Sequence, residues 1–334
     1  MDNSVGIRSK AHEKSELLTD IQRDHGGGID AARLAFGGAR IGWADLSTGI
    51  NPQPYPLPTF AAEVWTALPD TAAMDALCAA ARQFWNVPPA AAIMAAPGAS
   101  ALIAQIPALR APGRVHIPAP TYNEHAAAFA LQGWHAGGAD RADAQVVVNP
   151  NNPTGAVWSA QNLPVASPAL TIIDESFCDV WPDRSLIQLS RHEGTLVLKS
   201  FGKFWGLAGL RLGFAIGDPE LVARLRALLG PWAVSGPAMQ VGAAALQDAS
   251  WADSTRQRLA HDSERLDALM VKAGAKVEGG TPLFRLYHVD AAADWQNRLA
   301  QHHIWSRVFP YNSNWLRLGL PHPLHWPRLE AALA

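Results

Sequence analysis

The segment SFGKFWGLAGLR, residues 200–211, places one lysine among glycines and small residues, eight positions before an arginine. A lysine amine forms a Schiff base with an aldehyde cofactor only where it is close, sterically free and not permanently protonated. Lys203 is therefore predicted to hold such a cofactor. Ser200, Gly202 and Arg211 lie where a phosphate could bind, because a hydroxyl and a guanidinium both donate to phosphate oxygens. Taken alone, the segment also fits a solvated lysine in a surface turn.

Two further polar side chains follow apolar runs that are typical of buried strands. Asp174 ends the strand predicted in TIIDESF, residues 171–177, where its carboxylate could pair with a protonated ring nitrogen and keep the ring an electron sink. Asn152 lies in VVVNPNNPTG, residues 146–155, and its amide could donate to a phenolate oxygen. The proline and glycine of that segment equally indicate a simple tight turn.

Two other positions fit the same cofactor. Gly98, Ala99 and Ser100 begin a predicted helix, whose backbone N–H groups and dipole favour a phosphate. A plain capped helix would look similar. Tyr122 in PTYNEH follows another predicted strand and presents a flat ring for stacking, although a lone tyrosine is more often structural. The joint order of phosphate seat, aromatic ring, asparagine turn, carboxylate, lysine and arginine favours one cofactor site over these separate structural interpretations.

The elements that must position these residues alternate along the chain. Short apolar runs (IMAAP, VHIPAP, VVVNP, LTIIDES, TLVLKS and FAIGD) are separated by longer segments, several of them helical. This alternation predicts an α/β fold with a mostly parallel sheet flanked by helices, and functional loops after the strand ends. Beyond Pro219, helical segments precede a smaller α/β layer. We expect an N-terminal arm on the small domain (1–44), a large cofactor-binding domain (45–234) and a small C-terminal domain (235–334).

Composition excludes several other classes of protein. The 334 residues carry a net charge of −2 with no long basic run, so no nucleic-acid partner is expected. Cys78 and Cys178 lie far apart without metal-ligand spacing, which indicates a reducing compartment and no structural metal. No secretory signal is evident, so a cytoplasmic location is expected. Four prolines interrupt the long uncharged run 83–109, so no membrane span is expected there.

From about His25 to its C-terminus the chain resembles the fold-type I pyridoxal-phosphate enzymes, the class I/II aminotransferase superfamily. The resemblance implies pyridoxal 5'-phosphate as cofactor, with Lys203 as Schiff-base lysine and proton shuttle. It also implies that Asp174 pairs with the pyridine nitrogen, Asn152 bonds the ring oxygen and Tyr122 stacks on the ring. The cofactor phosphate would be held by Ala99, Ser100, Ser200 and Arg211. Arg317 in WLRLGLP would bind a substrate carboxylate, unless it is a surface arginine on a strand.

Within that superfamily the resemblance is greatest to the threonine-phosphate decarboxylases of cobalamin biosynthesis, neighbours of the histidinol-phosphate aminotransferases. It is carried by DHGGGIDAA, DLSTGINPQPYP, PTYNEHAAAFALQGW and DESFCDV. It implies a homodimer and a small phosphorylated amino-acid substrate, which is contacted by His25, Gly26, Asn51 and Arg307. The implied reaction is decarboxylation of L-threonine O-3-phosphate to (R)-1-amino-2-propanol phosphate. A histidinol-phosphate type transamination is the alternative, and a catalytically silent cofactor-binding protein is a third.

Three positions depart from the pattern of these relatives. Gly28 stands where they commonly have asparagine, which weakens one presumed phosphate contact. Leu68 precedes Pro69 where many relatives have a tyrosine that reaches the partner subunit's cofactor phosphate. Phe177, predicted to lie at the cofactor, replaces a tyrosine that donates to the ring oxygen in aminotransferases, so Asn152 would bond this oxygen alone. This last change is compatible with decarboxylation.

Overall fold

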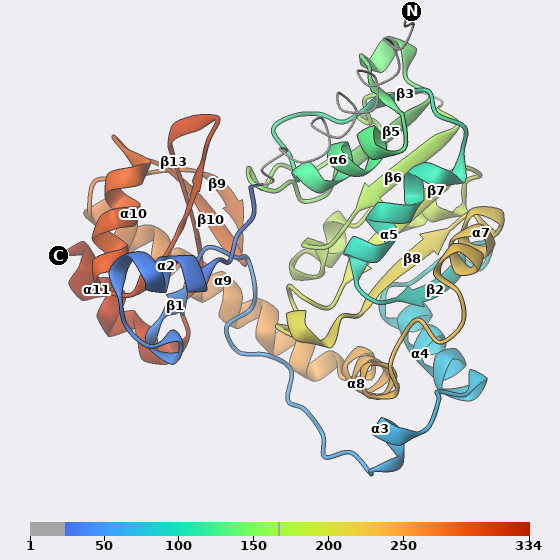
Figure 1. The fold of residues 1–334 in the computed structure, drawn as a ribbon, viewed down its shortest axis with the longest axis horizontal. Helices are drawn as coiled ribbons and strands as arrows, with labels where there is room; N and C mark the ends of the chain where they lie inside the picture. The colour runs from blue at the N-terminus through green and yellow to red at the C-terminus, as the bar shows by residue number, and fades with distance from the viewer. Residues whose placement is uncertain (1–23, 166–167) are drawn as a thin grey trace, which may run out of the picture.

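The computed structural model describes residues 24–165 and 168–334. They form a large lobe and a smaller lobe, with one long helix running between them (Figure 1). The polar N-terminal segment, for which the sequence favours either a helix or a loose arm, lies outside the described residues. Within the described ranges, no helix is both long enough and apolar enough to traverse a bilayer.

The large lobe is built on a seven-stranded sheet with the order β2-β8-β7-β6-β5-β3-β4. The neighbouring strands from β7 to β4 in this order all pair in parallel. Strand β8 is antiparallel to both of its neighbours, β2 and β7. The mostly parallel sheet predicted from the alternating pattern is thereby confirmed. The strands are β2 (Ala92–Ala96), β3 (Arg114–His116), β4 (His135–Ala136), β5 (Ala144–Val148), β6 (Leu170–Asp174), β7 (Thr195–Ser200) and β8 (Gly213–Gly217).

Helices cover both faces of this sheet, which explains why the central strands are apolar throughout. Successive strand residues point to opposite faces. Ile172 accordingly belongs to one core with Leu102 and Phe129, and its neighbour Ile173 belongs to the other with Leu77 and Val241. The large-lobe helices are α3 (Glu63–Thr66), α4 (Thr71–Phe84), α5 (Ala99–Gln105), α6 (Asn123–Leu131), α7 (Pro219–Leu229) and α8 (Gly236–Gln247).

The small lobe contains a four-stranded antiparallel sheet with the order β12-β13-β10-β9. Its elements are α9 (Ala249–Lys272), β9 (Lys276–Thr281), β10 (Phe284–His288), α10 (Ala292–Gln301), β11 (Ile304–Trp305), β12 (Arg307–Phe309), β13 (Asn312–Gly319) and α11 (Trp326–Leu333). The helical pattern after residue 235 divides into α8 and α9 at Asp248, whose carboxylate accepts from Trp251 N at 2.9 Å and so caps α9.

The beginning of the described chain packs on the small lobe (Figure 1). Helix α2 (Ile29–Phe36) contacts α10, and the two-residue strand β1 (Ala44–Asp45) pairs in parallel with β11. Trp43 and Ile29 share a small apolar cluster with Ala300. We call the segment that leads into α2, residues 24–28, the strap. It is thus anchored on the small lobe, opposite the large sheet.

Short 3-10 turns connect these elements at Arg40–Gly42, Ile106–Leu109, Ala139–Arg141, Cys178–Val180, Pro182–Arg184, Ile187–Arg191, Ala208–Leu210 and Pro323–His325. Within the described ranges no group of three or more histidine, cysteine, aspartate or glutamate side chains could hold a metal ion. Cys78 and Cys178 are both free thiols, half-buried and buried respectively.

Candidate active site

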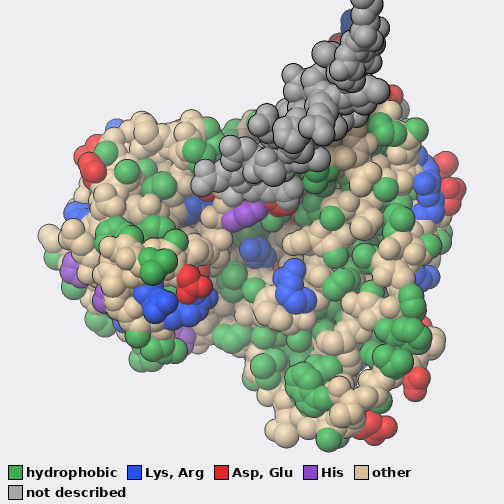
Figure 2. Space-filling model, viewed as in Figure 1, with side chains coloured by type: hydrophobic (Ala, Val, Ile, Leu, Met, Phe, Trp, Pro, Cys, Tyr) green, Lys and Arg blue, Asp and Glu red, His purple; other side chains and the backbone are tan. Residues whose placement is uncertain are grey.

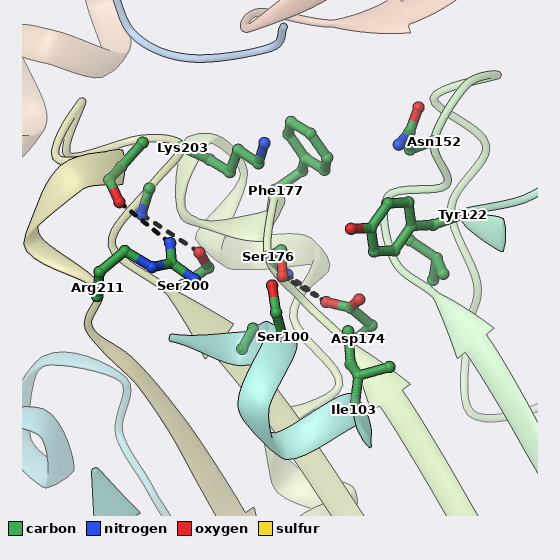
Figure 3. A pocket seen from close by; sticks show the side chains of 14 residues that line it. Ser100, Ile103, Tyr122, Asn152, Asp174, Ser176, Phe177, Ser200, Lys203 and Arg211 are labelled. Carbon is green, nitrogen blue, oxygen red and sulfur yellow. Dashed lines mark hydrogen bonds between the residues drawn. The ribbon is translucent and has the colours of Figure 1, made fainter. Parts of the chain in front are cut away.

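A cavity lies where the carboxyl ends of β5, β6 and β7 meet, and it encloses about 670 Å³ of empty space including its open mouth. In Figure 3 side chains from several segments point into this common space. All the residues predicted to hold the cofactor line it except Gly98, which lies directly beneath Arg211. The lining residues are Ala99, Ser100, Ile103, Tyr122, Val148, Asn152, Asp174, Ser176, Phe177, Ser200, Gly202, Lys203, Ala208 and Arg211.

Lys203 lies in the tight turn that follows β7. Its carbonyl accepts hydrogen bonds from Asn51 N at 3.0 Å and Gly206 N at 3.1 Å. Gly206 has a φ of 71°, and a Cβ there would lie 2.7 Å from Pro54 Cα, so this close approach requires glycine. Among the described residues the amine has no hydrogen bond or ion pair, and it lies 5.2 Å from the centre of the Phe177 ring.

The electrostatic surroundings make this amine a usable nucleophile. Burial, followed by the positive charge of Arg317, lowers the pKa of Lys203 to about 8, although Asp174 opposes the shift. Arg307 and Arg211 lower it further. A neutral amine fraction therefore exists near neutral pH, which Schiff-base chemistry requires.

Asp174 ends β6 and is only 2% exposed. Its Oδ1 accepts from Ser176 N at 3.0 Å and from Ser176 Oγ at 2.6 Å, while His125 Nε2 lies 2.9 Å from Oδ2. Burial would raise the pKa of Asp174, but the contacts with His125 and Ser176 outweigh it and hold the pKa below its ordinary value. A rigid, ionised carboxylate therefore faces the cavity.

His125 and Ser176 contact the Asp174 carboxylate, and the sequence reasoning missed both. His125 comes three positions after Tyr122, one turn further along α6, so the two lie on the same helix face. Their rings contact edge to face with centroids 6.1 Å apart. The local signal was thus present in PTYNEH, but only the fold reveals that this face meets the end of β6.

Arg211 lies against the start of α5, where the two could bind an anion. It has a φ of 53°, which is uncommon for a residue with a side chain. Its Nη1 donates to Ala208 O at 3.1 Å, and among the described residues it has no carboxylate partner. Gly98, with a φ of 86°, lets the guanidinium lie close, because a Cβ there would be 2.6 Å from Arg211 Nη2. Ser100 and Ser200 line the same end of the cavity.

Two further positively charged side chains come from the small lobe. Arg307 on β12 and Arg317 on β13 are register partners, so two like charges face each other across the hairpin. Such a pair is destabilising unless an anion compensates it. The one carboxylate that the structure places against it, Asp24, pairs with Arg307 and leaves Arg317 without an anionic partner among the described residues. The Nε atoms of both arginines are buried without a hydrogen-bond partner among the described residues. These observations indicate a second anion-binding site, at Arg307 and Arg317.

The hydrogen bonds of Arg307 and Arg317 fix the orientation of their guanidinium groups. Arg317 is 3% exposed and donates to Asn152 Oδ1 and, at 2.6 Å, to Ser47 O. Burial, followed by Arg307, lowers the pKa of Arg317 to about 9, which leaves it charged at neutral pH. Arg307 donates to the Asp24 carboxylate at 2.8 Å. Lysine and arginine side chains are visible in the hollow between the lobes in Figure 2.

His25 and Gly26 lie in the strap that crosses toward the large lobe. His25 Nε2 is 2.9 Å from Glu124 Oε1, and its ring centroid is 6.3 Å from that of Tyr122. A Cβ at Gly26 would lie 2.4 Å from Ser47 O, so this glycine lets the strap rest on the loop after β1. His25 therefore adjoins Tyr122, which lines the cavity, and Gly26 adjoins Ser47, whose carbonyl accepts from Arg317.

Asn51 does not line the cavity. It is 2% exposed, and its Nδ2 donates to Phe204 O at 2.9 Å while its Oδ1 accepts from Gln53 N and Arg258 Nη2. Its side-chain amide is hydrogen-bonded to the turn that carries Lys203, which we call the lysine turn. Direct substrate binding by this side chain stays a prediction.

Comparisons with known proteins show the family to which the chain belongs. The family model described as aminotransferase class I and II matches residues 138–323. A threonine-phosphate decarboxylase from Pseudomonas aeruginosa is 38% identical over 93% of this chain and 97% of its own. One from a Sinorhizobium species is 39% identical with the same coverage. A histidinol-phosphate aminotransferase from Mesorhizobium japonicum is 32% identical over 52% of this chain and 50% of its own.

Solved structures show the same fold. Histidinol-phosphate aminotransferase from Sinorhizobium meliloti, in complex with pyridoxal-5'-phosphate, superposes with a TM-score of 0.79 at 18% identity, covering 99% of this chain and 98% of the other. L-threonine-O-3-phosphate decarboxylase from Porphyromonas gingivalis gives a TM-score of 0.69 at 17% identity, covering 86% and 97% respectively. The sequence matches and the fold lead to one conclusion: the chain belongs to the aminotransferase class I and II family.

Proposed function

We propose that this protein uses pyridoxal 5'-phosphate to decarboxylate L-threonine O-3-phosphate to (R)-1-amino-2-propanol phosphate, a step of cobalamin biosynthesis. The observation that carries the proposal is the presence of two separate anion seats around one lysine, at Arg211 and at the facing pair Arg307 and Arg317. One seat suits a cofactor phosphate and the other an anionic substrate. Relatives 38% and 39% identical over 93% of the chain support this substrate.

The residues present fit the cofactor. Its phosphate would be held by Arg211, Ser200, Ser100 and the backbone at Ala99, and the glycine at position 98 gives Arg211 room to reach it. The ionised Asp174 would pair with the pyridine nitrogen. Asn152 accepts from Arg317 through Oδ1, so its Nδ2 is directed elsewhere and would donate to the ring oxygen. When bound, pyridoxal phosphate supplies an electron sink for the bond that breaks in the substrate.

The protein's own side chains orient the substrate and move one proton. Arg317 and Arg307 bind the negatively charged groups of the substrate. The strap, with His25 and Gly26, lies beside these arginines. Decarboxylation replaces the carboxylate by a proton at Cα, and Lys203 Nζ, with its pKa near 8, can hold and deliver that proton at neutral pH. The direction in which the arginines hold the carboxylate selects this reaction over transfer of the amino group.

Product analysis tests the proposal. The purified protein, loaded with pyridoxal phosphate, is incubated separately with L-threonine O-3-phosphate and with histidinol phosphate plus 2-oxoglutarate. We expect carbon dioxide and aminopropanol phosphate from the first substrate and no glutamate from the second. Glutamate formation without release of carbon dioxide would overturn the proposal in favour of an aminotransferase.

Replacing Arg317 by lysine should raise KM for threonine phosphate about 10- to 100-fold, the loss expected for one or two hydrogen bonds to a charged group. Lysine cannot bond Asn152 and Ser47 O while also presenting a planar pair of donors to a carboxylate. Steady-state kinetics measure the effect. Arg298→Lys, an exposed position stacked on Trp295 in the same lobe, is the control and should leave KM unchanged. Equal effects in both variants would contradict the assignment.

The homodimer implied by the resemblance is also part of the proposal. Large apolar side chains are exposed on and around α3 and before α8, which packs against α3, and hydrophobic side chains gather at this end of the molecule in Figure 2. They include Leu57, Trp65, Leu68 and Trp232, each more than 60% exposed. Such patches mark protein interfaces. Sedimentation equilibrium should show a dimer, and a monomer at all concentrations would contradict this.

A further inference from the structure

The turn that carries Lys203 is held from outside the cavity by one buried side chain. Asn51 donates its backbone N–H to Lys203 O at 3.0 Å and its Nδ2 to Phe204 O at 2.9 Å. It therefore binds two successive carbonyls of the turn. A Cβ on Gly206 would lie 2.9 Å from Asn51 O, which shows how tightly the two segments are packed.

The orientation of this amide is set by Arg258 on α9. Arg258 Nη2 donates to Asn51 Oδ1 at 2.9 Å, and Gln53 N donates to the same oxygen at 3.0 Å. With two donors on Oδ1, the Nδ2 must face Phe204 O. Arg258 itself is half-buried, and its Nη1 forms an ion pair with the Asp262 carboxylate at 3.6 Å, which is too long for a hydrogen bond. Because removing a guanidinium from water costs free energy, its placement against the Asn51 amide points to a specific role.

The same helix is tied to the substrate side of the cleft. Asp267, nine positions further along α9, accepts two hydrogen bonds from Arg285 at 3.0 and 2.7 Å and one from Tyr287 at 2.8 Å. Arg285 and Tyr287 are on β10, and Leu286 between them is the register partner of Arg317. Nine residues span about 13 Å of helix. Helix α9 therefore connects the lysine turn to the strand beside the substrate arginine.

We propose that Arg258 is a positioning residue for Lys203: it locks the Asn51 amide and so fixes the lysine turn relative to α9 and the Arg317 strand. The role rests on the proposed function only in taking Lys203 as the reacting amine. Arg258 acts through Asn51, at a site outside the cavity. Without it Asn51 Oδ1 keeps only the hydrogen bond from Gln53 N, so the amide and the turn that carries Lys203 are held less firmly relative to the small lobe.

Hydrogen exchange in the cofactor-free protein tests this directly. In Arg258→Met the amides of Asn51 and Gly206, which donate to Lys203 O, should exchange about tenfold faster, the effect of losing one charge-assisted hydrogen bond. Arg265→Met is the matched control: it removes a charge from the same helix, where Arg265 pairs with Glu330 at the surface. We expect wild-type exchange at both amides in this control.

A second measurement follows the lysine itself. The pH dependence of Lys203 modification by trinitrobenzenesulfonate should give an apparent pKa near 8 in the wild type and a higher value in Arg258→Met, because the released amine becomes more hydrated. With substrate, kcat should fall more than KM rises. If Arg258→Met does not fold, Arg258→Lys replaces it, since a single donor on a flexible stem holds the amide less firmly and should give a smaller rise in exchange.

Two outcomes would overturn the inference. One is unchanged exchange at Asn51 and Gly206 in both Arg258 variants. The other is an equal rise across the whole protein, including the amides of β6, which would mean only general destabilisation. Neither measurement needs a substrate, so failure of the decarboxylase proposal in product analysis would leave this test intact.

Discussion

Replacing Lys203 by methionine is expected to abolish activity and borohydride-stable attachment of pyridoxal phosphate, while making the cofactor-free protein more stable at neutral pH. The first effect follows because the thioether cannot form an imine. The second follows because the pKa of Lys203 is lowered to about 8 from 10.5 by burial and by Arg317. A protonated amine is thus unfavourable in this cavity, and methionine removes the unfavourable charge.

The sign of the pH dependence distinguishes this explanation from a simple packing gain. Between pH 8 and 10.5 the unfolded chain binds the lysine proton and the folded chain does not, so wild-type stability rises relative to the variant across this window. At pH 7 the advantage of Lys203→Met should be at most about 3 kcal/mol, less to the extent that the half-buried amine is hydrated. Above pH 10.5 it should vanish. Urea unfolding at pH 7 and at pH 10.5 measures both values.

Lys199 provides the matched control, four positions earlier on β7. It is 2% exposed and lies 2.7 Å from Glu175 and 3.6 Å from Asp179, and these carboxylates raise its pKa even though burial opposes this. Lys199→Met leaves two buried carboxylates without their cation and should destabilise the protein by about 3 to 5 kcal/mol. Destabilisation of Lys203→Met at pH 7 would refute the view that the cavity disfavours the protonated amine.

The residues predicted to hold the cofactor lie together in one cavity because their positions depend on strand ends. Asn152, Asp174 and Lys203 each follow an apolar strand, and parallel strands bring their carboxyl ends to one edge of the sheet. Local pattern and chain order therefore sufficed to place them together. Phe177 follows from the same logic, since it lies three residues beyond the end of β6.

The substrate side and the supporting contacts depend on tertiary packing, for which the sequence carries no local signal. The register of a β-hairpin that contains a bulge places Arg307 opposite Arg317. Strand β1 is two residues long and pairs with β11, far along the chain. Asn51 illustrates the difference most clearly. The resemblance implied that it contacts the substrate, and in the structure its amide is hydrogen-bonded to Phe204 in the turn that carries Lys203 and to Arg258 on α9.

Replacing Asp174 by asparagine is expected to lower kcat for threonine phosphate by about 10²- to 10³-fold, the loss typical for one electrostatic partner in a buried site. The neutral amide cannot stabilise a protonated pyridine nitrogen, so the cofactor becomes a weaker electron sink. Turnover and the cofactor's absorbance spectrum measure the effect. Asp143→Asn is the control, because Asp143 caps the opposite end of the sheet by accepting from Arg114 N at 2.8 Å.

His125 determines how this carboxylate responds to acid. Its contact with Asp174 Oδ2 contributes most to lowering the pKa against the opposing effect of burial, and Ser176 adds to it. In the wild type Asp174 should therefore stay ionised as the pH falls through the usual aspartate range. In His125→Asn the Asp174 pKa rises, so activity should fall on acidification at a higher pH than in the wild type, while at pH 8 the loss should be smaller than in Asp174→Asn. An unchanged acidic limb would mean that Ser176 alone keeps the carboxylate ionised, because its two hydrogen bonds are the other lowering contacts.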